Sequence, residues 1–421
     1  MMEYSDAQHY LYGLEKFGMV FGLENIKWLL SLIDNPHSSL KTVHVGGTNG
    51  KGSVASMLSH ILKEAGYTVG KYTSPHLVSF TERITVNEEN ISEEEVAELT
   101  ETIKKEVEKK DKERFFTFFD FTTALAFEYF SRKKTDIAII EVGLGGRLDS
   151  TNVIDPELSI ITNVSYDHTQ QLGEDIADIT EEKAGIIKGN TPVITGAHGI
   201  SAQIIETTAK KLNSPVYKLH RDFSFKKTGD QMMSYAGIMK NIDNLSINLM
   251  GDHQLTNGAM SLCAAEVLSS SGLSINESSV RKALTSIKWQ GRLEVVNENP
   301  IIILDGAHNP DSAHVLAEFF QSHYTDKKKI LIFGVMKDKD CRKIIEKIVP
   351  FTDKVILTRP ATERALLPDK MEGYVKNPFV TKDIRSALLK AKAVADENSM
   401  ILITGSFYTI GEAKTAIDDI F

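Results

Sequence analysis

A run of small residues around one lysine gives the clearest indication of this chain's chemistry. The segment His44-Val-Gly-Gly-Thr-Asn-Gly-Lys-Gly-Ser53 joins an apolar run to a helical pattern that we expect over residues 54–64. Glycines let the backbone approach an anion and point its N–H groups at it, and the helix adds the positive end of its dipole. We therefore expect this segment to bind the phosphates of a nucleotide, with Lys51 at the terminal phosphates and Ser53 at a magnesium ion.

The loop differs from the common phosphate-binding pattern at two positions. That pattern has a glycine separated by four residues from the Gly-Lys pair, and a serine or threonine directly after the pair. This chain has Val45 and Gly52 at those places. A glycine-rich hairpin with an exposed lysine is the alternative interpretation, but the strand before the loop and the helix after it favour a variant phosphate loop.

Three more polar side chains follow expected strands. Ser74 comes after the second strand, Glu141 ends the third, and His168 follows the fourth. In open parallel sheets ligands gather at the carboxyl ends of the strands, and Mg²⁺ prefers oxygen ligands to imidazole. Each residue alone could be a turn, strand-end or capping residue. Their common sheet edge beside the phosphate loop instead favours a metal site.

The elements that position these residues alternate between short β-rich runs and helical patterns, which is typical of α/β proteins with a parallel sheet covered by helices. We expect strands at 42–46, 68–72, 136–142, 158–164 and 192–195, then a small antiparallel appendage between about 223 and 250. A helix follows from Gln254. A second α/β series has strands at 301–304, 329–333, 354–358 and 400–404.

Length and composition agree with two domains and exclude some classes of protein. The 421 residues are too many for one ordinary core, and the net charge of −9 without a long basic run argues against a nucleic-acid partner. The two cysteines, Cys263 and Cys341, are too far apart to suggest a disulfide framework. Without a signal sequence or a membrane-spanning apolar run, we expect a cytoplasmic protein with no membrane partner.

Taken together, the motifs resemble those of folylpolyglutamate synthases and bifunctional dihydrofolate synthases, which are Mur-ligase-like, ATP-dependent amide-forming ligases. The resemblance covers nearly the whole chain. It is carried by residues 47–53, 73–77, 82–84, 141–149, 167–168, 182–186, 253–257, 291–292, 305–310 and 404–406. It implies that residues 1–293 form an ATP-binding domain like the central domain of Mur ligases, with a small antiparallel appendage and the folate site. Residues 294–421 would form a smaller, Rossmann-like glutamate-ligase domain.

The resemblance also implies a reaction. The γ-phosphoryl group of ATP passes to the γ-carboxylate of the glutamyl tail of a tetrahydrofolate, and the amine of L-glutamate attacks the resulting acyl phosphate. Bifunctional relatives also add glutamate to dihydropteroate. The implied partners are ATP, a reduced folate or dihydropteroate, L-glutamate and two Mg²⁺ ions, and a monomer is expected. Whether this chain has one or both activities, and which folate and tail length it prefers, stays open.

The resemblance implies a role for each residue that matches a functional position of the family. The catalytic residues are Lys51, Lys183 and His308, and Lys183 is carbamylated in relatives. The ATP-binding residues are Thr48, Asn49, Gly50, Lys51, Gly52, Ser53, Asn257, Arg292 and Asp305. The metal ligands are Ser53, Ser74, Glu141 and His168. The folate-binding residues are Gly18, Phe21, Thr117, Phe119, Leu148, Asp149 and Ser150, from segments that include 18–21. The residues near the incoming glutamate are His308 and Ser406.

Several of these residues have simpler interpretations. Lys183 could pair with a neighbouring glutamate, Glu181 or Glu182, on a helix surface, and Arg292 could form a surface ion pair with Glu294 or Asp305. His308 could be a turn histidine. The aromatic residues of 115–121 could simply be core, and Asp120 stands where the family often has glutamate, which shortens the reach of the charge.

Two other functions compete with folate ligation. A Mur-type peptide ligase of cell-wall synthesis would share the ATP chemistry, but it needs a pocket for a uridine nucleotide, usually on an additional N-terminal domain. Only about forty residues precede the phosphate loop. A non-enzymatic, nucleotide-gated binding module would need the phosphate loop alone, without Glu141, His168 and Lys183.

Overall fold

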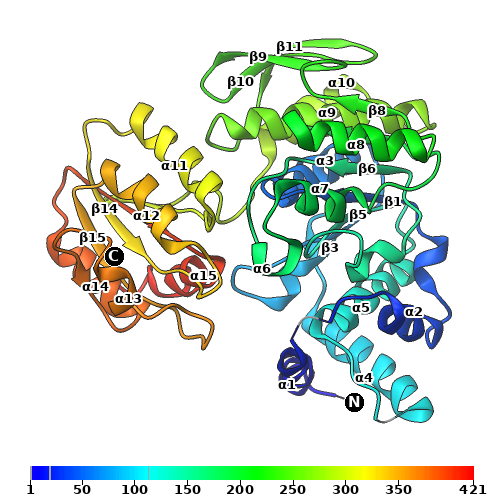
Figure 1. Cartoon of the computed structure of the whole chain (residues 1–421), viewed down its shortest axis with the longest axis horizontal. Coiled ribbons are helices and arrows are strands. Elements are labelled where there is room, and N and C mark those ends of the chain that lie inside the picture. Colours follow the sequence, from blue (N-terminus) through cyan, green and yellow to red (C-terminus); the bar gives the residue numbers. More distant parts are fainter. Residues whose placement is uncertain (1, 19, 112) are drawn as a thin grey trace.

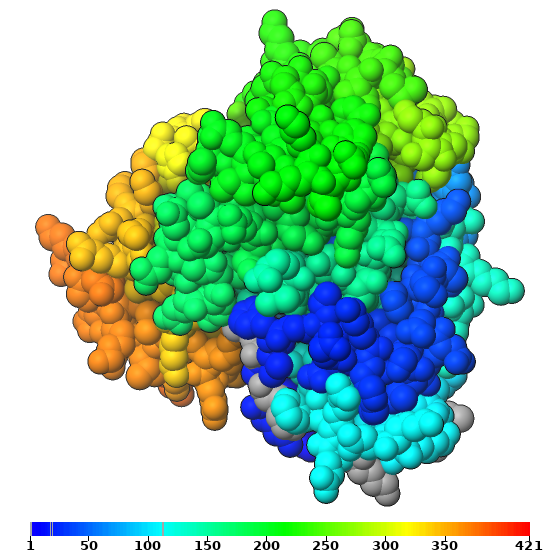
Figure 2. Space-filling model, turned by 45° about the vertical axis from the view of Figure 1, so that its right-hand side comes forward, coloured from blue at the N-terminus to red at the C-terminus, as the bar shows by residue number. Residues whose placement is uncertain are grey.

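The chain folds around two large sheets that lie side by side in the computed structural model, with a third, smaller sheet beside the first (Figure 1). The structure describes residues 2–18, 20–111 and 113–421. In the space-filling view the C-terminal part forms a yellow and orange lobe beside a larger blue and green one (Figure 2). No helix formed by these described residues is long and apolar enough to cross a membrane.

The first sheet has eight strands in the order β4-β3-β2-β5-β1-β6-β7-β8. All neighbours are parallel except the β2–β3 and β3–β4 pairs. The strands are β1 (Thr42–Gly46), β2 (Val69–Tyr72), β3 (Ile84–Val86), β4 (Glu89–Asn90), β5 (Ile137–Glu141), β6 (Leu158–Ile161), β7 (Val193–Thr195) and β8 (Val216–Lys218). The register pairs Val45 with Glu141, so the ends of β1 and β5 lie together.

Helices cover both faces of this sheet because alternate residues of its buried strands point to opposite sides. Ile137 and Ile139 of β5 enter one core with α3 (Lys51–Glu64), α9 (His253–Ser270) and α10 (Glu277–Ser286). Ala138 and Ile140 enter the other. That second core contains α1 (Tyr4–Gly13), α2 (Glu24–Ser31), α4 (Glu93–Lys110) and α5 (Phe118–Lys133). The remaining helices of this part are α6 (Thr169–Leu172), α7 (Ile176–Ala184) and α8 (Gly199–Lys211), with short 3₁₀ turns at Leu14–Phe17, Pro36–Ser39, Phe80–Arg83 and Ser150–Val153.

A three-stranded antiparallel sheet lies over α9 and α10, at the top of Figure 1. Its strands are β9 (Ser224–Gly229), β10 (Met232–Ala236) and β11 (Asn241–Ser246). The carboxylate of Glu266 on α9 accepts hydrogen bonds from the Tyr235 hydroxyl and the Ile238 N–H, both at 2.9 Å. These bonds attach the appendage to the helix beneath it.

The second sheet has six strands in the order β12-β13-β17-β14-β15-β16, and β12 is antiparallel to its neighbour. Its strands are β12 (Glu294–Glu298), β13 (Ile301–Leu304), β14 (Lys328–Phe333), β15 (Lys354–Leu357), β16 (Phe379–Val380) and β17 (Ser399–Thr404). One face packs on α11 (Pro310–Ser322) and α12 (Cys341–Ile348), and the other on α14 (Ile384–Val394) and α15 (Phe407–Ala416). The short α13 (Asp369–Glu372) and a 3₁₀ turn at Val349–Phe351 complete this part.

The predicted fold class is confirmed, and every expected strand is present. The strands β3, β4, β8, β12 and β16 were not predicted, and each lies at or near a sheet edge. Short edge strands carry too few buried residues to give a clear apolar run. We propose 1–293 and 294–421 as the two domains, because β12, the first strand of the second sheet, begins at Glu294.

Candidate active site

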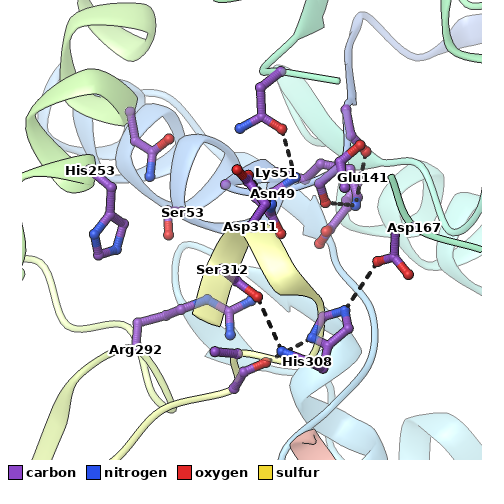
Figure 3. Close-up of a pocket in the computed structure, with 18 of the residues that line it drawn as sticks. Asn49, Lys51, Ser53, Glu141, Asp167, His253, Arg292, His308, Asp311 and Ser312 are labelled. Carbon is purple, nitrogen blue, oxygen red and sulfur yellow. Dashed lines mark hydrogen bonds and ion pairs between the residues drawn. The ribbon is translucent and has the colours of Figure 1, made fainter. Parts of the chain in front are cut away.

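A cavity of about 380 Å³ lies between the loops of the two sheets. Its walls come from the loops after β1, β2, β5 and β6, from the start of α9, and from the loop after β13 with α11 (Figure 3). The carboxyl ends of parallel strands thus meet across the cavity, as expected for open α/β sheets. Every predicted catalytic, ATP-binding and metal residue lines this cavity.

The phosphate loop has the backbone shape that its glycines allow. Gly47 and Gly50 have φ angles of 129° and 83°, which side chains rarely permit. A Cβ on Gly47 would stand only 2.0 Å from the hydroxyl of Thr162. Helix α3 begins at Lys51, three residues earlier than expected, and no described side chain caps it. Its first N–H groups are therefore available to an anion in the cavity.

Lys51 folds back over its own loop. Its Nζ donates to the carbonyl oxygens of Gly47 at 3.2 Å and Thr48 at 3.1 Å. Burial lowers the pKa of Lys51, while the nearby carboxylates of Glu141 and Asp167 act in the opposite direction. An anion in the cavity would offer this buried ammonium stronger partners than backbone carbonyls.

Lys183 on α7 is buried behind the same loop. Its Nζ donates to the Gly47 carbonyl oxygen at 3.0 Å, and burial together with the charge of Lys51 lowers its pKa to about 7. The alternative of a surface pair with Glu181 or Glu182 is wrong, because Lys183 is buried and its Nζ bonds Gly47, while Glu182 pairs with Arg147 at 2.6 Å. A lysine with such a pKa is substantially neutral at pH 7 and can react as an amine.

Glu141 ends β5 and lies beside the phosphate loop. One carboxylate oxygen accepts the N–H of Ser74 at 3.2 Å, and the same oxygen would stand 3.4 Å from a Cβ on Gly52. Burial raises the pKa of Glu141, although Lys51 and the Ser74 N–H partly offset this rise. No described basic side chain forms an ion pair with Glu141, and a buried carboxylate of this kind is well suited to a cation.

The donor set fits Mg²⁺ in part. Across the described chain, no group of three or more His, Cys, Asp and Glu side chains is arranged to hold a metal. Mg²⁺ commonly takes only one or two carboxylates and completes its shell with phosphate oxygens and water. Ser53, Ser74 and Glu141 provide such oxygens at the cavity wall. His168 also lines it, but its Nε2 lies 3.0 Å from Nζ of Lys339.

A polar cluster joins the two sheets at the rim of the cavity. Asp167, after β6, accepts a hydrogen bond from Lys339 Nζ at 2.6 Å and one from Asn309 Nδ2 at 3.1 Å. The Nε2 atom of His308 lies 3.5 Å from the same carboxylate, as Figure 3 shows. Asn309 also donates to Asn49 of the phosphate loop at 3.0 Å. The cluster thus brings the second sheet against the nucleotide loop.

Sequence reasoning assigned no role to Asp167, Asn309 or Lys339. Asp167 and Asn309 lie within motifs that carried the resemblance, so the signal was present for both. Lys339 lies in the charged run 337–340, which has the composition of an exposed loop. His308 is more than a turn histidine, because it bonds the Gly306 carbonyl oxygen through Nδ1 at 2.8 Å and faces Asp167 through Nε2.

Arg292, at the junction between the sheets, lines the cavity without an ion pair. Its guanidinium lies 4.4 Å from the ring centre of Phe407, and within the described ranges no carboxylate comes within 4.0 Å of it. Glu294 pairs instead with Lys414 at 2.5 Å. The alternative of a surface ion pair is therefore wrong. Asp305 accepts N–H groups of Leu293 and Ala307, both at 2.9 Å.

Two predicted residues, one on a helix and one at a helix cap, have clear local roles. Asn257 on α9 reaches the phosphate loop, since a Cβ on Gly50 would stand 2.5 Å from its Oδ1. Ser406 caps α15 by accepting the Thr409 N–H at 3.0 Å, and it does not line the cavity. His253 also lines the cavity and lies in a motif that carries the family resemblance, but no role was predicted for it.

The predicted folate residues lie inside the described ranges, and none of them lines this cavity. One group lies directly behind the cavity wall. Thr117 caps α5 together with Asp120, whose carboxylate accepts the Ser150 hydroxyl at 2.7 Å. The Phe119 ring packs on Gly143, since a Cβ on Gly143 would stand 2.3 Å from the ring. Gly143 itself lines the cavity.

The other predicted folate residues are more scattered. Burial raises the pKa of Asp149 to about 6, and its carboxylate accepts the Leu144 N–H at 2.8 Å. Leu148 is half-buried, and Gly18 and Phe21 are exposed. Met19, within the predicted 18–21 segment, lies outside the described residues. Of the aromatic run, Phe116 and Phe121 are core residues, Phe118 and Phe119 are half-buried, and Phe115 is exposed.

Comparisons with known proteins agree with this geometry. Two family models match the chain, the Mur ligase middle domain over residues 45–265 and the Mur ligase glutamate ligase domain over residues 291–407. A dihydrofolate synthase/folylpolyglutamate synthase from Bacillus subtilis is 35% identical over 423 residues, which cover 98% of each chain. A folylpolyglutamate synthase from Lacticaseibacillus casei is 32% identical and covers 99% of each chain.

Solved structures give the same result. A folylpolyglutamate synthase from Thermotoga maritima superposes with a TM-score of 0.85 at 36% identity, covering 99% of this chain and 96% of that one. E. coli FolC in complex with DHPP and ADP superposes with a TM-score of 0.91 at 28% identity, covering 100% of this chain and 99% of that one.

Proposed function

We infer the reaction of this chain from its family: it belongs to the Mur ligases, in the branch of the folylpolyglutamate and dihydrofolate synthases. The protein is an ATP-dependent ligase that adds L-glutamate to the γ-carboxylate of tetrahydrofolate (poly)glutamates through an acyl phosphate. We propose dihydropteroate as a second acceptor, as in the bifunctional relatives. The observation that carries this function is one cavity holding the phosphate loop, Glu141, Lys183 and the second sheet's His308. A cell-wall ligase is not favoured, because the relatives named above are folate ligases.

We propose that Thr48, Asn49, Gly50, Lys51, Gly52, Ser53, Asn257, Arg292 and Asp305 contact ATP. Phosphoryl transfer spreads negative charge over the phosphate oxygens, and fixed donors stabilise that charge without reorganising. Lys51, the first N–H groups of α3 and the Arg292 guanidinium supply such donors from both sheets. Because the two sheets meet at this cavity, we propose that their closure around the substrates would keep out water that hydrolyses an acyl phosphate.

We propose that Ser53, Ser74, Glu141 and His168 hold two Mg²⁺ ions, which would neutralise and polarise the phosphate oxygens. For His168 to act as a ligand, its contact with Lys339 must be exchanged. We propose the carbamate of Lys183 as a further anion in this site, since its lowered pKa leaves a neutral amine to react with carbon dioxide.

Replacing Glu141 with glutamine should weaken Mg²⁺ binding to the ATP complex by about tenfold or more. The amide keeps the size of the side chain but removes the negative charge that attracts the cation. ADP release should then cease at Mg²⁺ concentrations that saturate the wild type. The control is Glu157→Gln, at an exposed position directly before β6. Calorimetric titration of Mg²⁺ into the ATP complex measures the effect, and undiminished affinity would show that Glu141 is not a ligand.

We propose that the folate lies against the wall formed by Thr117, Phe119 and residues 148–150, with Gly18 and Phe21 at its outer edge. Aromatic side chains such as Phe119 can stack on a flat heterocycle. The incoming glutamate would lie on the other side of the cavity near His308, with Ser406 supporting that wall through its cap on α15. We propose that the protein is a cytoplasmic monomer, as expected from the sequence and the family resemblance.

The function is tested by ADP release from the purified protein with three acceptors: tetrahydrofolate, dihydropteroate and a uridine-nucleotide peptide precursor, each with its amino acid. We expect release with tetrahydrofolate and L-glutamate. Release with dihydropteroate and L-glutamate would establish the second activity. Turnover with the uridine nucleotide alone would contradict the folate assignment and favour a cell-wall ligase.

A further inference from the structure

Trp289 lies against Gly52 of the phosphate loop. A Cβ on Gly52 would stand 2.9 Å from Cζ2 of the Trp289 ring, which is closer than packed atoms allow. Position 52 is where the common phosphate loop has serine or threonine. A side chain at position 52 would therefore collide with the Trp289 ring unless the ring moved. Trp289 does not itself line the cavity.

The ring is held in place from behind by a buried charge. Nζ of Lys71, on β2, lies 5.0 Å from the ring centre, and the Lys71 side chain is only 2% exposed. Lys71 forms an ion pair with Glu88, which also accepts the Ser59 hydroxyl at 2.7 Å. A buried and paired ammonium over an aromatic face is a fixed contact, because moving either partner would expose an unpaired charge.

The same stretch of chain also contacts the second sheet. Trp289 lies in the linker between the end of α10 at Ser286 and the start of β12 at Glu294. Three residues after Trp289, the Arg292 guanidinium stacks on Phe407 of α15. This short linker therefore packs on the phosphate loop near one end and on a helix of the second sheet near the other.

We propose that Trp289 is a positioning residue for ATP, which acts through Gly52 to hold the phosphate loop in its binding shape. Trp289 also anchors the linker, which leads to the second sheet, against the phosphate loop. The proposal rests on the proposed function only in taking the loop to bind ATP. It predicts that the loop shape depends on the ring of Trp289 and on the absence of a side chain at Gly52.

The chain offers a matched control in its other tryptophan. Trp28 on α2 is also half-buried, stacks on Phe116 with ring centres 5.6 Å apart, and has the Arg114 guanidinium 4.5 Å from its ring centre. Like Trp289, it therefore has a cationic side chain over its ring. It is not in contact with the phosphate loop, so Trp28→Phe should leave ATP binding unchanged.

The test is ATP binding by calorimetry, together with the KM values of the three substrates. Trp289→Ala should raise the dissociation constant and the KM for ATP by about tenfold or more, since small displacements of a binding loop have effects of that size. The KM for folate and for L-glutamate should change by less than about twofold. Trp289→Phe should lie between the wild type and Trp289→Ala. Wild-type ATP affinity in a folded Trp289→Ala protein would overturn the proposal.

A double variant tests the contact itself. Gly52→Ala should weaken ATP binding, because its new methyl group meets the tryptophan ring. In Gly52→Ala/Trp289→Ala that clash is gone. The double variant should therefore bind ATP at least about fivefold more tightly than is predicted by multiplying the losses of affinity in the two single variants. Single effects that simply multiply would overturn the proposal.

Fluorescence gives a readout that needs no substitution at Trp289 or Gly52. In the Trp28→Phe protein, Trp289 is the remaining tryptophan, and its emission should change when ATP saturates the loop. Unchanged emission would overturn the proposal even if the Trp289 and Gly52 variants failed to fold. These binding measurements need neither folate nor glutamate. A wild-type protein that binds ATP but does not ligate glutamate would therefore contradict the proposed function and leave the role of Trp289 standing.

Discussion

Replacing Lys183 with alanine should reduce ligase turnover by about a thousandfold, as expected when a group that stabilises transferred charge is lost. If the residue acts as a carbamate, a small carboxylic acid such as acetate should enter the vacated space and restore part of the rate. Lys188→Ala is the matched control. Its ammonium also donates to a backbone carbonyl, that of Asn152 at 3.0 Å, but it does not line the cavity.

The carbamate also predicts a dependence on pH and carbon dioxide. Carbon dioxide adds only to the neutral amine, and a pKa lowered to about 7 makes the neutral form of Lys183 abundant above pH 7 and scarce below about pH 6. Protein freed of carbon dioxide should therefore regain activity on adding bicarbonate at pH 8, and far less at pH 6. Full activity without carbon dioxide, or Lys183→Ala with near-normal turnover, would rule out this role.

Replacing Lys51 with alanine should remove most turnover, with a loss of about a hundredfold to a thousandfold. In the proposed ATP site its ammonium would stand where the phosphate charge develops, and the loop carbonyls that now bind it cannot supply a positive charge. The fold should stay intact, since removing a buried charge does not open the core. Steady-state ADP release and a thermal melt measure the two effects.

The control for this experiment is Lys63→Ala, an exposed lysine in the last turn of the same helix. It removes one positive charge from α3 without touching the cavity, so turnover should be unchanged. Near-normal turnover in Lys51→Ala would contradict the assignment of the phosphate loop. A loss of the folded state in Lys51→Ala would instead show that the lysine supports the loop structurally.

The centre of each sheet could be predicted because buried parallel strands are continuous apolar runs, as β5 and β13 are. The loops that follow such strands meet at one edge, and this is why Glu141 and Lys51 could be placed together. The edge strands β4 and β16 have two residues each and left no such signal. Their pairing depends on neighbours that are distant in sequence.

The electrostatic environment of the site was less predictable than its location. A lysine next to two glutamates has the same sequence pattern whether exposed or buried, so only the packing of α7 shows that Lys183 faces Gly47. Likewise, Lys339 lies in a charged segment, and folding alone brings its ammonium to Asp167 and His168. Such contacts join residues more than a hundred positions apart, beyond the reach of local patterns.

The cluster around Asp167 couples two equilibria. They are the binding of ATP in the cavity and the position of the second sheet against the phosphate loop. Asn309 contacts both Asn49 of the phosphate loop and Asp167, so a conformer with separated sheets lacks one wall of the nucleotide site. The apparent affinity for ATP is then the intrinsic affinity multiplied by the population of the joined conformer. Any change that depopulates this conformer, even on the far side of the second sheet, weakens ATP binding by the same factor.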